Sequence, residues 1–102
     1  MTAVSDKENI KRMLVESLAH DPEVDRIIIF GSFVRSDNPG DLDVAVFQHS
    51  NESYLPLAMK YRRQTRAVAR AIPLDIIPLR TGVGEDPFLE EIKSGEVIYE
   101  RS

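Results

Sequence analysis

Two apolar segments joined by a short polar connection limit the folds open to this chain. The segment DRIIIFGS, residues 25–32, holds consecutive apolar residues and ends in a Gly-Ser turn, which predicts a short strand buried on both faces. The segment DLDVAVF, residues 41–47, is the second predicted strand. The connection between them is rich in Ser, Asp, Asn, Pro and Gly and is short for a parallel crossover. We therefore expect the two strands to pair as antiparallel neighbours.

The rest of the chain alternates helical and strand patterns. Ser5 and Glu8 stand in capping-box spacing before an apolar stripe, and Asp86, Pro87 and Gly95 are typical of the start and end of a short helix. The prolines of the third apolar segment indicate a strand at a sheet edge or at strand ends. The predicted helices cover residues 5–20, 51–72 and 86–94, and the predicted strands cover residues 25–32, 41–47, 73–79 and 96–100. This order predicts one α+β domain over residues 1–102.

Charge and composition exclude several classes of function. The net charge of -4 and the pI of about 5.1 argue against a general affinity for nucleic acid or an anionic membrane, so any anion site must be local. The chain has no Cys, which excludes disulfides, thiolate zinc sites and cysteine nucleophiles and favours the reducing cytosol. No segment approaches the roughly 20 apolar residues that cross a bilayer, and the N-terminus has no apolar signal region. We expect a soluble cytoplasmic protein with no membrane partner.

Three aspartates stand in predicted strands, where an isolated charge is expensive. Residues two apart in a strand project to the same face, so Asp41 and Asp43 are expected side by side. Such carboxylates repel each other, and a hard divalent cation such as Mg²⁺ resolves the repulsion most simply. Asp75, the one charged residue of the segment 73–79, makes sense if it joins them. Three convergent carboxylates can hold two metal ions for in-line phosphoryl transfer.

The connection before these aspartates carries residues suited to phosphate. Gly31 removes the side chain where a backbone would approach an anion, and Ser32 offers a hydroxyl and an N–H. Arg35 is placed to add charge-assisted contacts. The predicted phosphate-binding residues are therefore Gly31, Ser32 and Arg35, beside the predicted catalytic and metal-binding residues Asp41, Asp43 and Asp75.

The combined motif resembles a known family. Gly-Ser at residues 31–32, Asp-Leu-Asp at residues 41–43 and a lone Asp75 in a later apolar strand are similar to the signature of the DNA polymerase β nucleotidyltransferase superfamily. The small size and the ending DPFLEEIKSGEVIYER resemble the minimal nucleotidyltransferases encoded beside HEPN-domain proteins, including MntA-type antitoxins. The resemblance covers most of the chain over residues 25–101.

The resemblance implies a fold, an activity and a partner. The fold is a two-layer nucleotidyltransferase fold, with a mixed, mostly antiparallel sheet of about four strands packed with helices. The activity is transfer of a nucleoside monophosphate, AMP from ATP, onto a hydroxyl, with two Mg²⁺ ions that Mn²⁺ can replace. Carried over residue by residue, Ser32 binds the nucleotide phosphates, Asp41 and Asp43 bind the metals, and Asp75 binds the catalytic metal beside the attacking hydroxyl. Arg35 matches a phosphate-contacting arginine. The implied partner is a HEPN-domain protein in an assembly that does not require nucleic acid, with a tyrosine as the acceptor.

A row of arginines leaves two interpretations open. Residues 53–72 contain five basic residues and no acid, although the protein is acidic. On a helix, Arg62, Arg63, Arg66 and Arg70 lie opposite the apolar stripe, which is ordinarily a solvated face. The other interpretation is a surface for the triphosphate, an RNA or an acidic partner.

Other functions fit parts of the sequence. A catalytically weak module that neutralises a HEPN-type protein by contact is the alternative, supported by the arginines and by the compact loop at residues 36–40. An unrelated two-layer α+β domain is a third option. In either case Asp75 could be an edge-strand acid paired with an arginine such as Arg70.

Overall fold

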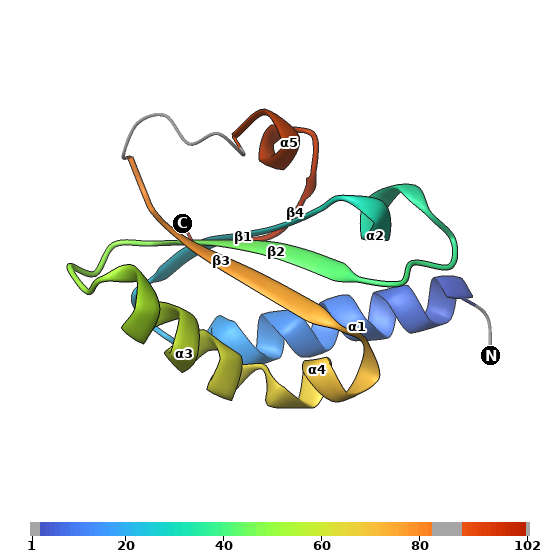
Figure 1. The fold of residues 1–102 in the computed structure, drawn as a ribbon, viewed down its shortest axis with the longest axis horizontal. Helices are drawn as coiled ribbons and strands as arrows, with labels where there is room; N and C mark the ends of the chain where they lie inside the picture. The colour runs from blue at the N-terminus through green and yellow to red at the C-terminus, as the bar shows by residue number, and fades with distance from the viewer. Residues whose placement is uncertain (1–2, 83–88, 102) are drawn as a thin grey trace.

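The computed structural model describes residues 3–82 and 89–101, which form a four-stranded sheet with helices on both faces (Figure 1). In chain order the elements are α1 (Ala3–Leu18), β1 (Val24–Phe30), α2 (Ser32–Arg35), β2 (Leu42–Gln48), α3 (Tyr54–Gln64), α4 (Arg66–Ala71), β3 (Leu74–Arg80), α5 (Leu89–Lys93) and β4 (Glu96–Glu100).

The strand order across the sheet is β3-β2-β1-β4. β1 pairs antiparallel with both β2 and β4, whereas β2 and β3 are parallel. The predicted α+β class and the mixed, mostly antiparallel sheet are confirmed, and so is the antiparallel pairing of the first two predicted strands. β3 is an edge strand with β2 as its one neighbour in the sheet. This position explains how β3 accommodates Pro78, because proline has no backbone N–H to donate and an edge strand needs fewer such bonds than a central one.

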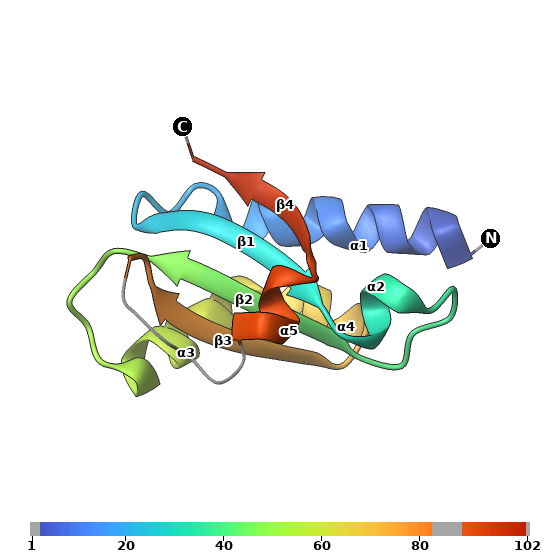
Figure 2. The same ribbon diagram turned by 90° about the horizontal axis from the view of Figure 1, so that it is seen from above.

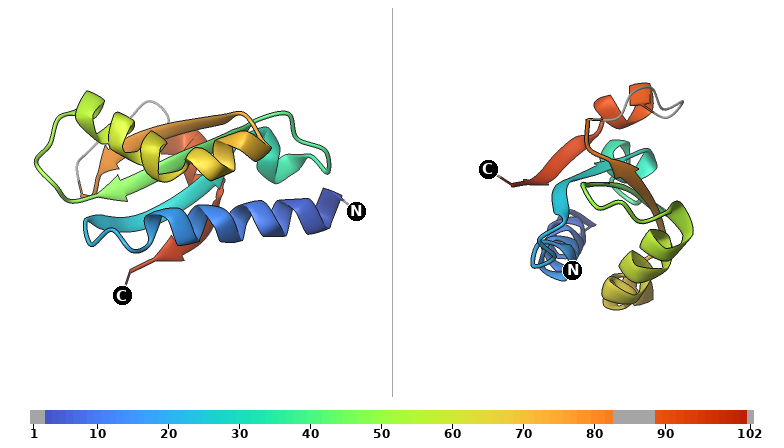
Figure 3. Two further views of the ribbon diagram at one scale, coloured as in Figure 1. Left: turned by 90° about the horizontal axis from the view of Figure 1, so that it is seen from below. Right: turned by 90° about the vertical axis from the view of Figure 1, so that its left-hand side faces the viewer.

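The helices form unequal layers on the two faces. α1, α3 and α4 lie together below the sheet in Figure 1, and the side view in Figure 3 shows α5 on the opposite face. The view from above in Figure 2 shows that α5 is short beside the long α1. Among the described residues, α1, α3 and α4 cover one face of the sheet along its length, and α5 covers part of the other.

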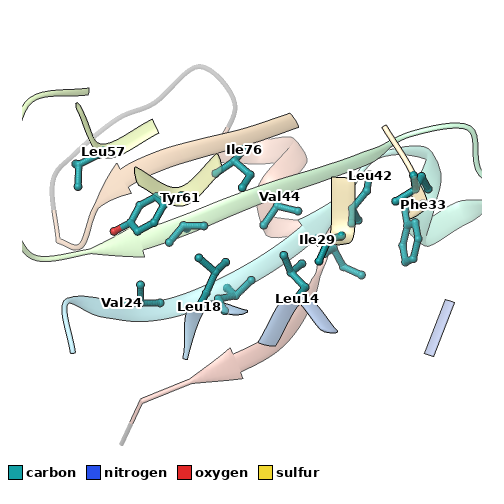
Figure 4. Packing of buried hydrophobic residues seen from close by; sticks show 14 residues of the cluster. Leu14, Leu18, Val24, Ile29, Phe33, Leu42, Val44, Leu57, Tyr61 and Ile76 are labelled. Carbon is teal, nitrogen blue, oxygen red and sulfur yellow. The ribbon is translucent and has the colours of Figure 1, made fainter. Parts of the chain in front are cut away.

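The core follows the alternation of side chains along the two central strands. Ile27 and Ile29 of β1 face α1, α3 and α4, whereas Ile28 and Phe30 face the α5 side, where Ile92 covers them. β1 is thus buried on both faces, as predicted for the segment over residues 25–32, although the strand itself ends at Phe30. Figure 4 shows the larger cluster, in which the main buried side chains are Leu14, Leu18, Ile29, Val44, Tyr61 and Ile76.

Two of the predicted helices differ from those in the structure. α1 begins at Ala3, so Ser5 lies inside the helix and the prediction that it caps the helix is wrong. The limits of helices are weakly fixed and commonly differ by one or two residues from those expected. The predicted helix over residues 51–72 is divided into α3 and α4 at Thr65. The buried Thr65 hydroxyl donates to the Tyr61 carbonyl oxygen at 2.7 Å, and this bond to the preceding turn distorts the helix.

The last predicted helix is confirmed in part. α5 ends at Lys93, shortly before Gly95 as predicted, while Asp86 and Pro87 lie outside the described residues. None of the helices described, from α1 to α5, has the length and apolar character that a membrane crossing requires.

A glycine at the start of β4 gives a test of this packing. A Cβ at Gly95 would collide with the carbonyl oxygen of Ile29 and would lie 3.0 Å from the Ile28 side chain. We expect Gly95→Ala to lower the free energy of unfolding by about 1–3 kcal/mol, as other overpacked sites do, measured by urea denaturation. Gly40→Ala is the matched control, because a Cβ there meets nothing within 4 Å. Equal effects of the two substitutions would contradict this packing.

Candidate functional site

Three strands meet at one end of the sheet, where two of the predicted aspartates lie side by side. Asp43, near the start of β2, is the register partner of Phe30 at the end of β1 and of Asp75 near the start of β3. Register partners project to the same face, and neighbouring strands lie about 4.8 Å apart. The two carboxylates therefore leave the sheet on the α5 side, the same face as Phe30 and Ala45.

Gly31 brings the backbone close to one of these carboxylates. Its φ of 76° is a backbone angle that residues with a side chain rarely adopt. A Cβ at this position would lie 2.6 Å from Oδ2 of Asp43. Glycine is therefore required at this position both for the backbone conformation and for the space. The close approach places the end of β1, where phosphate binding is predicted, directly beside the predicted metal ligand Asp43.

The short helix α2 follows Gly31 and carries the other predicted phosphate contacts. Ser32 is its first residue and is half-buried, and Arg35 is its last residue and is exposed. The sequence patterns did not predict this helix, because four residues are too few for a helical period. Within the helix, the Ser36 amide donates to the Ser32 carbonyl oxygen at 2.9 Å.

The loop after α2 is held from a distant part of the chain. The Lys7 ammonium of α1 donates to the Ser36 carbonyl oxygen at 2.8 Å and lies 5.3 Å from the centre of the Phe33 ring, which is fully buried. Lys7 thus fixes the end of α2 and the start of the loop that leads to Asp41. No spacing in the sequence could have revealed this contact, because the residues are 29 positions apart.

Asp41 lies just outside the strand that was expected to contain it. β2 begins at Leu42, one residue later than predicted, and Asp41 is exposed. The Leu42 amide donates to the Pro73 carbonyl oxygen at 2.9 Å, which joins the start of β2 to the start of β3. The structure therefore brings Gly31, Asp43 and Asp75 together, with Asp41 at the adjacent edge.

The aspartates suit a divalent cation that is completed by other ligands. Among residues 3–82 and 89–101, no group of three or more His, Cys, Asp or Glu side chains is arranged to hold a metal by itself. Mg²⁺ is commonly bound by one or two carboxylates together with water and substrate phosphates, and Asp43 and Asp75 provide such a pair. The binding of two ions by all three aspartates stays a prediction.

The structure gives no support to the alternative that Asp75 is an edge-strand acid paired with an arginine. Asp75 is exposed on β3, and in the described part of the chain it forms no ion pair with Arg70 or with any other basic side chain. Its position is set by the parallel register with β2 and not by a charged partner.

Two other polar features lie away from these aspartates. A hollow of about 460 Å³ lies on the helical side, between α1, the loop over residues 37–40 and residues 71–73. At the other end of the sheet, Asp25 accepts from the Thr81 hydroxyl at 2.7 Å and lies 2.9 Å from Nδ1 of His49. Burial opposes ionisation of Asp25, but these two contacts hold its pKa below the ordinary value. That cluster joins strand ends and has a structural role.

Comparison with known proteins places the chain in one family. Residues 9–102 match the family model described as polymerase beta, nucleotidyltransferase. No curated protein matches the sequence significantly.

Several solved structures share the fold. The MntA–HepT toxin–antitoxin complex contains a chain that is 14% identical, with a TM-score of 0.61 over 92% of this chain and 73% of the other. A complex of the tri-AMPylated HEPN toxin of Shewanella oneidensis with MNT antitoxin gives 14% identity and a TM-score of 0.64 over 93% and 73%. A candidate nucleotidyltransferase from Sulfolobus solfataricus gives 21% identity and a TM-score of 0.60 over 99% and 89%. At these identities the likeness concerns the fold, and it confirms the nucleotidyltransferase architecture.

Gly31 and Gly82 form a matched pair for testing the site. Both have a positive φ, 76° and 80°, but a Cβ at Gly82 meets nothing within 4 Å. We expect alanine at either position to cost about 1–3 kcal/mol of stability from backbone strain. Only Gly31→Ala should also displace the Asp43 carboxylate and weaken Mn²⁺ binding by about tenfold or more, measured by electron paramagnetic resonance. Unchanged Mn²⁺ binding in a folded Gly31→Ala variant would show that Asp43 is not a metal ligand.

Proposed function

The chain belongs to the polymerase beta nucleotidyltransferase family, and from this membership we propose that it transfers AMP from ATP onto a hydroxyl group in a Mg²⁺-dependent reaction. The observation that carries the proposal is the in-register pair of Asp43 and Asp75 beside the close backbone approach at Gly31. That arrangement provides carboxylates for a cation and a backbone for phosphate at the same end of the sheet.

Some residues of the candidate site would contact the nucleoside triphosphate, and others would contact the acceptor hydroxyl. Gly31 and Ser32 would hold the triphosphate with their N–H groups and the Ser32 hydroxyl, and Arg35 would add charge-assisted contacts. Asp43 is half-buried against Gly31, so it belongs to the nucleotide side of the site. Asp75 is exposed on an edge strand, so it is the carboxylate that an incoming acceptor meets first.

The reaction follows from this division. The acceptor oxygen forms a bond to the α-phosphorus, the bond from that phosphorus to the bridging oxygen breaks, and pyrophosphate leaves. The proton of the acceptor hydroxyl passes to a carboxylate at this edge, for which Asp75 is exposed and lies beside Asp43. Divalent cations held by Asp43 and Asp75, with Asp41 at the adjacent edge, would neutralise charge on the phosphates. The protein contributes mainly positioning and electrostatic stabilisation.

The proposed acceptor is a hydroxyl on a HEPN-type partner protein, such as a tyrosine hydroxyl. The support comes from the solved relatives, one of which is a complex of a tri-AMPylated HEPN toxin with its MNT antitoxin. A relative that shares the fold in such a complex makes this class of partner the first to test.

A second function has a specific observation in its favour. The arginines of α3 and α4 are exposed and form no ion pair within the described part of the chain, as expected of a surface that meets an acidic partner. A module that neutralises a HEPN-type protein by contact alone would need such a surface and would not need the aspartates.

Substitution of the aspartates distinguishes the two functions. We expect Asp43→Asn and Asp75→Asn to lower the transfer of labelled AMP from MgATP to a HEPN-type protein by about 100-fold or more, because the charge that holds the cation is lost. Asp37→Asn is the control, since Asp37 is an exposed acid in the neighbouring loop. Asp37→Asn should transfer at the wild-type rate.

Two outcomes would contradict the proposal. Wild-type transfer by Asp75→Asn would remove that residue from the site. Full neutralisation of the HEPN-type protein by Asp43→Asn, with intact binding and no transfer in the wild-type protein, would favour the contact module.

A further inference from the structure

The outward side of α3 exposes large apolar side chains. The exposed fractions of Tyr54, Leu55 and Met59 are 57%, 62% and 50%, and these are three of the four large apolar residues that are exposed in the described structure. The fourth is Val97 of β4, at 51%. Scattered exposed apolar residues are ordinary, but Leu55 and Met59 are four residues apart on one side of the helix and form a local apolar patch, whereas Tyr54 lies on a different side.

Arginines continue this patch along the same side of the helices. At 100° per residue, Leu55, Met59, Arg62 and Arg63 of α3 lie within an arc of about 100° that points away from Leu57 and Tyr61 in the core, and Arg66 and Arg70 of α4 are exposed as well. The helical hydrogen bonding persists across Thr65, since its amide donates to Tyr61 and its carbonyl accepts from Ala69. The apolar end and the basic end therefore form one continuous surface, which we call the outer face of α3 and α4: Leu55, Met59, Arg62, Arg63, Arg66 and Arg70.

Within residues 3–82 and 89–101, the arginines of this surface form no ion pair. All 17 Asp and Glu residues of the sequence lie outside residues 53–72. The basic residue that does point toward acids is Lys60, whose ammonium lies 3.1 Å from Asp21 and 3.6 Å from Glu23. Arg62 and Arg66, and Arg66 and Arg70, are four residues apart, a spacing at which like charges on a helix repel. In the described part of the chain, no acidic side chain pairs with these arginines to offset this repulsion.

A shallow groove runs beside the apolar end. It has a volume of about 360 Å³ and is lined by Glu52, Leu55, Pro56, Met59, Lys60 and Arg63. The lining combines the apolar Leu55, Pro56 and Met59 with the cationic Lys60 and Arg63 and the single acid Glu52. An apolar groove beside the arginines of α3 and α4 can receive a helix with one apolar side and acidic flanks.

We infer that the outer face of α3 and α4 is a docking surface for an acidic amphipathic helix of a partner protein. Exposed Leu and Met favour a protein over an RNA, and the net charge of -4 disfavours RNA because the rest of the surface would repel phosphates. Arginine pairs with carboxylates through two parallel hydrogen bonds, which gives such a contact direction as well as attraction.

The docking surface lies on the other side of the sheet from the aspartates. α3 and α4 belong to the layer opposite α5 (Figure 3). Asp43 and Asp75 leave the sheet on the α5 side, because their neighbours along the strands, Val44 and Ile76, belong to the cluster under α1, α3 and α4. A helix bound to the outer face would leave the candidate active site open. The inference therefore goes beyond the proposed function, because docking here requires no nucleotide transfer.

A designed helical peptide provides the probe. The full chain, labelled with ¹⁵N, is titrated with a stapled peptide that has a leucine stripe flanked by glutamates, with the same peptide carrying lysines, and with a single-stranded RNA. We expect only the acidic peptide to bind, with NMR shifts confined to α3 and α4 and with affinity that falls as salt rises. Arg63→Glu with Arg66→Glu, and separately Met59→Ser, should each weaken binding by about tenfold.

Matched controls come from the same chain. Arg12→Glu reverses an exposed charge on α1, and Val97→Ser removes a side chain exposed to nearly the same extent as Met59; both should bind the acidic peptide as the wild type does. Absence of acidic-peptide binding, shifts outside α3 and α4, or RNA binding in its place would each overturn the inference. So would self-association that the arginine reversals abolish in analytical ultracentrifugation, because the occupant would then be a second copy. Loss of AMP transfer alone would bear only on the proposed function.

Discussion

The parallel pairing of β2 with β3 is the contact on which the candidate site depends. Its register places Asp43 opposite Asp75, and the Leu42 amide anchors that register on the Pro73 carbonyl oxygen. A slip of one residue would turn Asp75 to the covered face and move Ile76, which is 1% exposed, out of the core. An unpaired carboxylate beneath α3 and α4 would be strongly unfavourable. The register that packs the core is therefore the one that assembles the carboxylates.

The two faces of the sheet have different roles: one holds most of the hydrophobic core, and the other holds the carboxylates of the candidate site. The long layer of α1, α3 and α4 buries the main apolar cluster, so this face contributes most of the hydrophobic stabilisation. In the part of the chain that the structure describes, the other face carries the short α5 and a smaller cluster, and the carboxylates lie at the end of this face, where β1 ends and β2 and β3 begin. Charged groups can remain hydrated there. Gly31 allows the chain to turn closely over Asp43 without a side chain in the way.

The strands were the easiest part to predict. The run Ile27–Phe30 has apolar residues at consecutive positions, which in so short a segment indicates a strand covered on both faces, and β1 is such a strand. The prolines of the segment 73–79 correctly indicated an edge. The helical boundaries were harder to predict: Thr65 interrupts a regular apolar stripe through a side-chain bond to its own backbone, and α2 has too few residues to show any period.

The sequence by itself determined the family, the strands and the candidate site residues. Gly-Ser, Asp-Leu-Asp and a lone Asp75 are unusual among apolar residues, and each can be recognised from its immediate neighbours in the sequence. The tertiary structure alone decided how these residues meet. The register of Asp43 with Asp75 and the support of α2 by Lys7 join positions about 30 residues apart, and the pairing of β1 with β4 joins positions that are still farther apart. Such contacts depend on how whole layers pack, and local patterns of hydrophobicity carry no information about that packing.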